Sequence, residues 1–103
     1  MVTQAAAIND TKKFIIDLRN IGINLRKAYL FGSYLNQNQH EHSDIDIALV
    51  ADEFIGVGPI DIKLIVSILR KNKLIHATTY SNSDYDDGNP FLDEIKKNGL
   101  ELL

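Results

Sequence analysis

The chain has 103 residues (1–103), which suffices for one compact domain but not for two. Its formal net charge of −3 argues against direct nucleic-acid binding, which needs a basic face, but leaves room for a small anionic substrate held by local cations. Because it has no cysteine, no apolar run of membrane-spanning length and no signal-peptide pattern, we expect a cytoplasmic protein without disulfides or membrane contact.

The first predicted helix covers residues 9–21, where apolar side chains recur at helical spacing. Asn9 or Asp10 can cap its start, and Gly22 suits its end. A short apolar strand is predicted next, at residues 28–31.

Beyond a polar loop, residues 44–51 have the clearest strand pattern, because they are rich in β-branched and aliphatic side chains. Pro59 then suits the first turn of a helix, which we predict over residues 60–72. The apolar stripe of that helix consists of Ile62, Ile65, Val66 and Leu69. The stripe is most simply core, although part of it could serve a partner protein or a homodimer.

A third strand is predicted at residues 74–80, followed by a turn-rich loop over residues 81–89. The pair Asn89-Pro90 has the cap-and-proline pattern of a helix start, a glycine ends that helix, and residues 100–103 can add a short edge strand. The predicted order is therefore helix, strand, short helix, strand, helix, strand, helix and strand, within one domain.

Two acids interrupt the apolar strand that begins at residue 44. Side chains alternate between the faces of a strand, so Asp44 and Asp46 share one face while Ile45 and Ile47 share the other. The two carboxylates are about 6–7 Å apart along the backbone, close enough to hold hard cations between them. Magnesium commonly combines one or two carboxylates with substrate phosphates. Two such ions can activate an attacking hydroxyl and stabilise the leaving oxygens of a phosphoryl-type displacement.

A Gly-Ser pair follows the first apolar strand. Gly32 has no β-carbon, so a phosphate can approach its backbone closely. Ser33 is predicted to stand at the start of a short helix, where unpaired N–H groups and its hydroxyl favour an anion. The Gly-Ser pair would bind the phosphates, and the two acids would bind the metal ion that those phosphates also coordinate. The two parts of the site therefore complement each other.

Gly32-Ser33, ten intervening residues and then Asp44-x-Asp46 resemble the signature of the DNA polymerase β-like nucleotidyltransferase superfamily. The apolar strand before the glycine, a serine before the first acid and the aliphatic run after the second agree with that signature. Over nearly its full length the chain resembles the smallest branch, the minimal nucleotidyltransferases of bacteria and archaea, and the tail at residues 89–103 is similar to theirs.

The resemblance implies a two-layer α+β fold of the polymerase β type, with a mixed sheet and helices packed mainly on one face. It implies that Gly32 and Ser33 bind a nucleoside triphosphate, while Asp44 and Asp46 ligate Mg²⁺ or Mn²⁺. The reaction would move AMP from ATP to a hydroxyl and release pyrophosphate. Minimal members often pair with a HEPN-domain toxin, an RNase, and act as the antitoxin, which can neutralise the toxin by adding AMP to a tyrosine.

Three features depart from the family pattern. The family commonly carries Arg or Lys shortly after Gly-Ser, whereas residues 34–37 are Tyr-Leu-Asn-Gln, so a cation that would face phosphate is missing. Active members add a carboxylate from a later strand, but His76 stands in this third-acid position. Imidazole is a poorer magnesium ligand than carboxylate, although it can act as a base. No second domain is expected, so a partner or a shallow surface would select the acceptor.

Other residues admit two interpretations. His40 and His42 could bind a transition metal, but no third ligand is spaced near them, and a solvated loop is the simpler interpretation. Asp84, Asp86 and Asp87 do not match the spacing of an EF-hand, so a turn before the last helix is favoured over a calcium loop.

Aromatic residues beside the Gly-Ser pair could stack on a base. Phe31 is expected in the core, which leaves Tyr34 as the better stacking candidate. The basic residues Lys12, Lys13, Arg26 and Lys27 form no long run and are expected to be solvated.

The sequence therefore supports two functions of different classes. The first is a Mg²⁺-dependent protein adenylyltransferase, with Asp44 and Asp46 as catalytic metal ligands and His76 in the third position. The second is a catalytically degenerate module of the same fold that neutralises or scaffolds its partner by occlusion. The intact Gly-Ser and Asp-x-Asp favour the enzyme, whereas the missing cation and the missing third acid favour the module.

Overall fold

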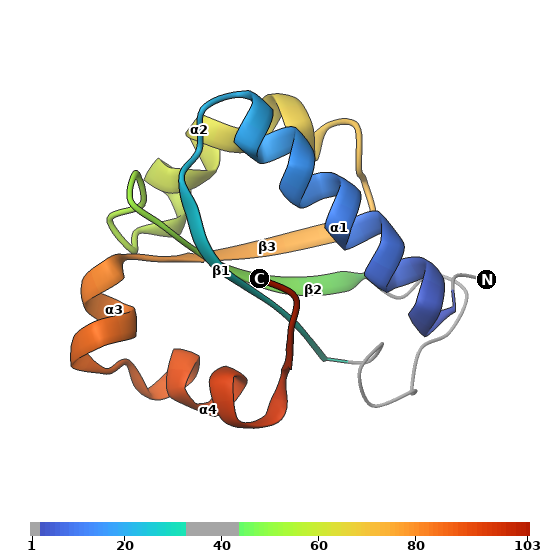
Figure 1. Cartoon of the computed structure of the whole chain (residues 1–103). Coiled ribbons are helices and arrows are strands. Elements are labelled where there is room, and N and C mark those ends of the chain that lie inside the picture. The colour runs from blue at the N-terminus through green and yellow to red at the C-terminus, as the bar shows by residue number, and fades with distance from the viewer. Residues whose placement is uncertain (1–2, 33–43) are drawn as a thin grey trace.

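The computed structural model describes residues 3–32 and 44–103, which form a four-stranded sheet and four helices (Figure 1). Within the described residues, their order follows the sequence prediction except for one additional helix, α3. The short helix predicted from Ser33 lies outside those residues. The elements are α1 (Gln4–Asn20), β1 (Leu25–Phe31), β2 (Ile45–Ala51), α2 (Gly58–Leu69), β3 (Ile75–Tyr80), α3 (Asn82–Asp87), α4 (Pro90–Asn98) and β4 (Leu100–Glu101).

The sheet is mixed, with the strand order β3-β2-β1-β4. The strand β1 runs antiparallel to both β2 and β4, whereas β2 and β3 are parallel and are joined through α2. A parallel pair needs such a crossover, because its second strand must start at the same end of the sheet as its first. The two parallel strands therefore begin side by side at the edge where β1 ends.

The helices cover the two faces of the sheet unequally. In Figure 1, α1 and α2 lie on one face, while α3 and α4 lie on the other. The larger apolar cluster joins Phe14 and Leu18 of α1 to Ile65 of α2 and to one face of the strands. A smaller cluster around Val50 and Leu92 joins the opposite face to α3 and α4. The predicted α+β fold, with most helical packing on one face, is confirmed.

The strand β2 is apolar along most of its length because both of its faces are covered. Ile45, Ile47 and Leu49 belong to the larger cluster, whereas Ala48 and Val50 belong to the smaller one. Side chains of alternate residues point to opposite faces, so a strand covered on both sides loses the polar–apolar alternation of a half-exposed strand. The acids at its beginning stand out for this reason.

The helix α1 begins earlier than predicted. Its N-cap is Thr3, whose hydroxyl accepts a hydrogen bond from the backbone N–H of Ala6 at 3.1 Å. The predicted caps Asn9 and Asp10 lie inside the helix and are exposed, so that prediction was wrong. Three alanines, residues 5–7, carry the helix backward because alanine has a high helix propensity, and Ala7 also packs in the larger apolar cluster.

The predicted turn-rich loop at residues 81–89 contains the helix α3. Ser81 and Asp84 form a capping box: the Asp84 backbone N–H donates to the Ser81 hydroxyl at 3.1 Å, and the Ser81 N–H donates to the Asp84 carboxylate at 2.9 Å. This Ser-x-x-Asp pattern starts a helix even among residues of low helix propensity. Asn89 caps α4 as predicted, by accepting from the N–H groups of Phe91 and Leu92.

Across residues 3–32 and 44–103, no helix combines the length and the apolar character that crossing a membrane requires.

Candidate active site

The site is built where β1 ends beside the beginning of β2. Gly32 follows the last residue of β1 and has a φ of +82°, which residues with a β-carbon rarely adopt. A β-carbon built on Gly32 would also overlap the Asp46 carboxylate. Glycine is therefore required twice, by the backbone conformation and by the approach of the acid. The predicted phosphate ligand Ser33, together with Tyr34, His40 and His42, lies outside the described residues.

Three side chains form a row across the sheet. Phe31 of β1 is paired with Asp46 of β2, and Asp46 is paired with His76 of β3. Residues paired in this way present their side chains on the same face. The Asp46 Oδ1 lies 3.5 Å from the His76 Nδ1, and the side chains are 29% and 71% exposed, respectively. The structure thus brings the predicted second acid and the predicted third-position residue together on an accessible surface.

Asp44 immediately precedes β2 instead of lying within it, and it is exposed. Its neighbours Ile45 and Ile47 are buried at 1% and 0% exposure, so the predicted separation of core residues from acids is confirmed. Isoleucines anchored in the core fix the orientation of β2, which keeps the carboxylate of Asp46 on the opposite face.

The donor set suits a hard cation only when a substrate completes it. Within residues 3–32 and 44–103, no three His, Asp, Glu or Cys side chains converge as a ready-made metal site. Asp44 and Asp46 offer carboxylate oxygens, and His76 offers a nitrogen. Magnesium is commonly bound by one or two carboxylates together with phosphate oxygens. The residues present therefore fit a metal that arrives with a nucleotide.

A further acid, Asp61 of α2, is fully buried but belongs to a different region. Its carboxylate accepts hydrogen bonds from the N–H groups of Ile55 and Gly56 at 3.0 and 2.9 Å and from the Thr79 hydroxyl at 2.9 Å. Thr79 and His76 are an odd number of residues apart on β3, so their side chains point to opposite faces of the sheet. Asp61 therefore cannot serve as the third acid beside Asp46.

Sequence reasoning missed the role of Asp61, although a local signal exists. An acid in the first turn of a helix can accept hydrogen bonds from the backbone of the loop that enters the helix. Here it joins the loop after β2 to β3, and it thereby holds the two parallel strands in place around α2.

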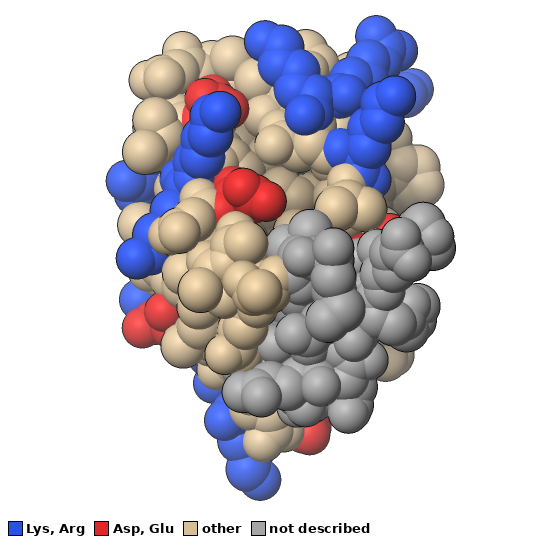
Figure 2. Space-filling model, turned by 90° about the vertical axis from the view of Figure 1, so that its right-hand side faces the viewer, with Lys and Arg blue, Asp and Glu red and all other residues tan. Residues whose placement is uncertain are grey.

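Lysines gather beside the edge where β2 and β3 begin. Lys13 of α1 lines a hollow together with Lys71 and Lys73 from the segment after α2 and with the first residues of the two strands, Ile45 and Ile75. Figure 2 looks onto this side of the molecule and shows several Lys and Arg side chains gathered on it. Lys13 is exposed, as expected, and the fold also gives it cationic neighbours from a distant segment.

A groove lies on the same face of the sheet as Asp46 and His76. Its volume is about 780 Å³. Its lining residues are Phe31, Thr78, Tyr80, Pro90, Phe91, Glu94 and Ile95. Phe31 was expected in the core, yet it is only partly buried and contributes to this groove as well as to the smaller apolar cluster. The remaining lining residues come from β3 and α4 and were not singled out from the sequence.

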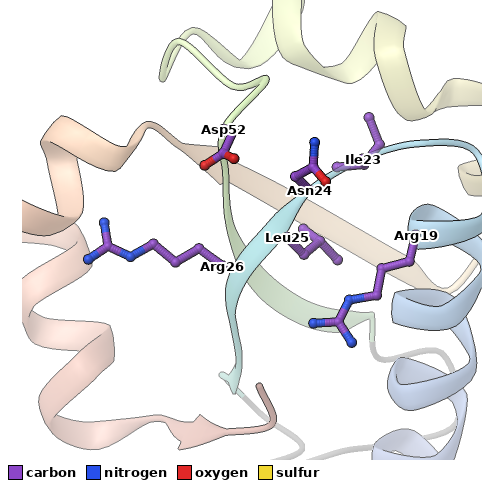
Figure 3. A pocket seen from close by; sticks show the side chains of 6 residues that line it. All are labelled: Arg19, Ile23, Asn24, Leu25, Arg26 and Asp52. Carbon is purple, nitrogen blue, oxygen red and sulfur yellow. The ribbon is translucent and has the colours of Figure 1, made fainter.

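A second hollow, of about 540 Å³, lies at the start of β1, the end of the strand away from Gly32 (Figure 3). In Figure 3, the Arg26 side chain extends from β1 toward α3, whereas the Arg19 side chain extends from α1 toward the other side of β1. Arg26 makes two hydrogen bonds to the Asp86 carboxylate, at 2.9 and 2.7 Å, and lies 4.5 Å from the centre of the Tyr85 ring. These arginines do not converge on a common ligand.

Comparisons with known proteins agree with this fold. The family described as "Polymerase beta, Nucleotidyltransferase" matches residues 13–102. A proposed nucleotidyltransferase from Sulfolobus solfataricus shares the fold, with a TM-score of 0.67 and 19% identity over 95% of this chain and 80% of that chain. None of the curated proteins matches.

Two toxin–antitoxin structures are also similar. One was solved with AMP-PNP and has a TM-score of 0.62 and 25% identity over 88% of this chain and 71% of that chain. The other, MntA-HpeT, carries two Asp-to-Glu changes two positions apart and has a TM-score of 0.63 and 22% identity over 89% of this chain and 71% of that chain. Because the family match spans most of its length, the chain belongs to the polymerase β nucleotidyltransferase family.

Proposed function

We propose that the protein is a Mg²⁺-dependent nucleotidyltransferase that moves AMP from ATP to a hydroxyl on a partner protein. The observation that carries this proposal is the row of Asp46 and His76 beside Gly32, at the open edge of the sheet. A carboxylate, a potential base and a backbone without a β-carbon meet there, and all three are accessible from one face.

In this proposal Gly32 and Ser33 bind the triphosphate through backbone N–H groups and the serine hydroxyl. Asp44, which is exposed, and Asp46, which is partly exposed, hold Mg²⁺, or Mn²⁺ in its place, through their carboxylate oxygens. When bound, the metal would neutralise developing charge on the phosphates and orient them. Residues 34–37 carry no cation. Positive charge near the phosphates would instead come from three lysines beside the start of β2 and β3: Lys13, Lys71 and Lys73.

His76 is the proposed general base. Its Nδ1 faces Asp46, which leaves Nε2 to take the proton of the incoming hydroxyl. The hydroxyl oxygen then forms a bond to the α-phosphorus of ATP, and the bond from that phosphorus to the bridging oxygen of pyrophosphate breaks. The carboxylate of Asp46 stabilises the protonated imidazole, as the third member of a hydrogen-bonded set commonly does.

The partner is proposed to be a toxin, with a HEPN-domain RNase as the specific candidate. Two similar structures are toxin–antitoxin complexes, and one of them contains AMP-PNP, an analogue of ATP. These likenesses support the idea that this protein is the antitoxin of such a pair and acts by adding AMP to the toxin.

A binding module without catalysis is the second candidate. The described residues contain no cluster of three potential metal ligands, and His76 replaces the third acid of active members. Such a module would neutralise its partner by occlusion, and nucleotide binding would be weak or independent of metal.

Label transfer separates the two candidates. The purified protein is mixed with α-labelled ATP, with Mg²⁺ or Mn²⁺, and with lysate of the source cells. We expect a labelled protein band with wild type that is lost in D44N/D46N and kept in D87N, a matched change at an exposed acid on α3. Folded wild-type protein that labels no band with either metal would favour the binding module.

A further inference from the structure

We propose that the groove between β3 and α4 holds the purine base of the nucleotide. This inference rests on the proposed function, because it assumes that the triphosphate lies at Gly32 and the metal at Asp46. The groove would discriminate between nucleotide bases. The Gly-Ser pair and the two acids cannot do so, because they contact the phosphates and the metal that all nucleoside triphosphates share.

The groove begins directly beside the proposed phosphate and metal site. Phe31, one of its lining residues, precedes Gly32 and is paired with Asp46 across the sheet. Thr78, another lining residue, is two positions beyond His76 on β3 and therefore faces the same side. Thr78 lies one strand away from Asp46, about 5 Å across the sheet, and two residues further along the strand direction, about 7 Å. A ribose can span this distance.

The lining has the composition that a base requires. Aromatic rings of Phe31, Tyr80 and Phe91 surround the groove together with the apolar side chains of Pro90 and Ile95. Bases stack on aromatic side chains, and stacking favours the large ring system of a purine. Phe91 is 76% exposed at the first turn of α4, so packing in the core does not explain its apolar character.

Polar groups of the groove offer selectivity. The Glu94 carboxylate lies on the lining, and the Asn98 amide holds its Oε1 by a hydrogen bond. An ionised carboxylate can only accept hydrogen bonds, so it favours a base that carries an exocyclic amino group over one that has only carbonyls at the corresponding position. The Thr78 hydroxyl can donate or accept. We therefore expect ATP to bind more tightly than UTP.

A base is a better occupant than the acceptor because Phe31, which lines the groove, directly precedes Gly32. Base and triphosphate are parts of one molecule, so the two binding surfaces must lie a fixed and short distance apart. An acceptor side chain belongs to a second molecule and has no such constraint. It would reach the α-phosphate from the side opposite the leaving pyrophosphate.

Calorimetric titration tests the inference with two ligands that share the phosphates but differ in the base. Mg²⁺-ATP and Mg²⁺-tripolyphosphate are each titrated into wild type, F91A, F91Y and I16A. Ile16 is a control because it is an apolar residue on α1 that is 58% exposed. We expect F91A to weaken ATP binding about tenfold, in line with the loss of one stacking contact, and to leave tripolyphosphate binding unchanged. F91Y and I16A should resemble wild type.

An F91A variant that binds ATP as wild type does would overturn the base assignment while leaving the proposed function intact. If that variant also fails in label transfer, the groove holds the acceptor instead of the base. If wild type binds neither ligand in the presence of Mg²⁺, the nucleotide site itself is wrong, and both proposals fall together.

The variant E94Q tests the selectivity. An amide can donate as well as accept, so we expect E94Q to narrow the difference between ATP and UTP affinities that wild type shows. An unchanged ratio of the two affinities would remove Glu94 from base recognition.

Discussion

The Asp46 carboxylate occupies the space that a β-carbon on Gly32 would need. The glycine thus has a structural reason for its position that is independent of any phosphate. The missing β-carbon lets Gly32, part of the proposed phosphate site, lie in direct contact with Asp46, the proposed metal ligand. This contact couples the two halves of the Gly-Ser…Asp-x-Asp pattern. A substitution at Gly32 should therefore displace the Asp46 carboxylate.

The variant G32A should lose stability and nucleotide binding together. The added methyl group meets both a positive φ and the Asp46 carboxylate, so we expect a loss of about 2–3 kcal/mol in the free energy of unfolding. Urea unfolding measures the loss, and titration with Mg²⁺-ATP measures the binding.

Two other glycines supply matched controls for that experiment. Gly22 has a φ of +95° but no atom within 4 Å of an added β-carbon, so G22A reports the backbone strain alone, about 1 kcal/mol. Gly58 has neither feature, and G58A should be neutral or slightly stabilising. If G32A cost no more than G22A, the contact with Asp46 would have no energetic weight.

The variant H76D should strengthen metal binding. It places a carboxylate beside Asp46, where His76 Nδ1 now lies 3.5 Å from Oδ1, and so completes an oxygen donor set for Mg²⁺. Titration of Mn²⁺ in the presence of ATP, followed by electron paramagnetic resonance, would show a lower dissociation constant than in wild type. Variant H76Q, which has no carboxylate, should not show the gain. Equal metal affinity in all three proteins would mean that position 76 does not reach the metal.

The variant D61A should strongly destabilise the fold. It leaves the two backbone N–H groups and the Thr79 hydroxyl without their buried acceptor, which should cost about 3 kcal/mol or more. D61N keeps one acceptor oxygen and should lose less. Chemical unfolding gives both values. Because Asp61 lies on the face away from Asp46, Mg²⁺-ATP affinity of the folded fraction should stay close to wild type. A selective loss of affinity in D61N would contradict this separation.

Stability should fall in acid as three carboxylates are protonated. The N–H of Ser81 lowers the pKa of Asp84, Arg26 lowers the pKa of Asp86, and Lys27 lowers the pKa of Glu101. A group whose pKa is lower in the folded state stabilises that state above the unfolded value, about 4, and the contribution disappears as pH falls through the folded value.

The midpoint of urea unfolding should therefore be flat near neutral pH and decrease below pH of about 4. The variant D86N should show a shallower decrease and a lower midpoint at pH 7, because it no longer carries the ion pair with Arg26. Parallel curves for wild type and D86N below pH of about 4 would show that this pair does not contribute to acid stability.

Elements that depend on near neighbours were predicted well from the sequence. The pair Asn89-Pro90 marks the start of α4, and the alternation around Asp46 separates the acid from the buried isoleucines. The helix α3 was missed although its capping box, Ser81 and Asp84, is also local, because acids, serine and glycine at this position favour a turn equally well.

Relations between distant segments could be inferred only in part. Resemblance to a family led us to expect His76 near the two acids, and the parallel pairing of β2 and β3 places it opposite Asp46. Nothing local indicates that Asp61 contacts Thr79 or that Lys13 lies beside Lys73, because each of these pairs joins residues from segments far apart in the chain.

The sequence by itself determined the order of most elements, the faces of β2 and the family of the protein, since these follow from spacings of a few residues and from one specific pattern. Only the tertiary structure decided why position 32 must be glycine, which face of the sheet carries Asp61, and that Phe31 and Phe91 line one groove. These features depend on strand order and register, which arise from packing between residues far apart in the chain. A local pattern does not encode that packing.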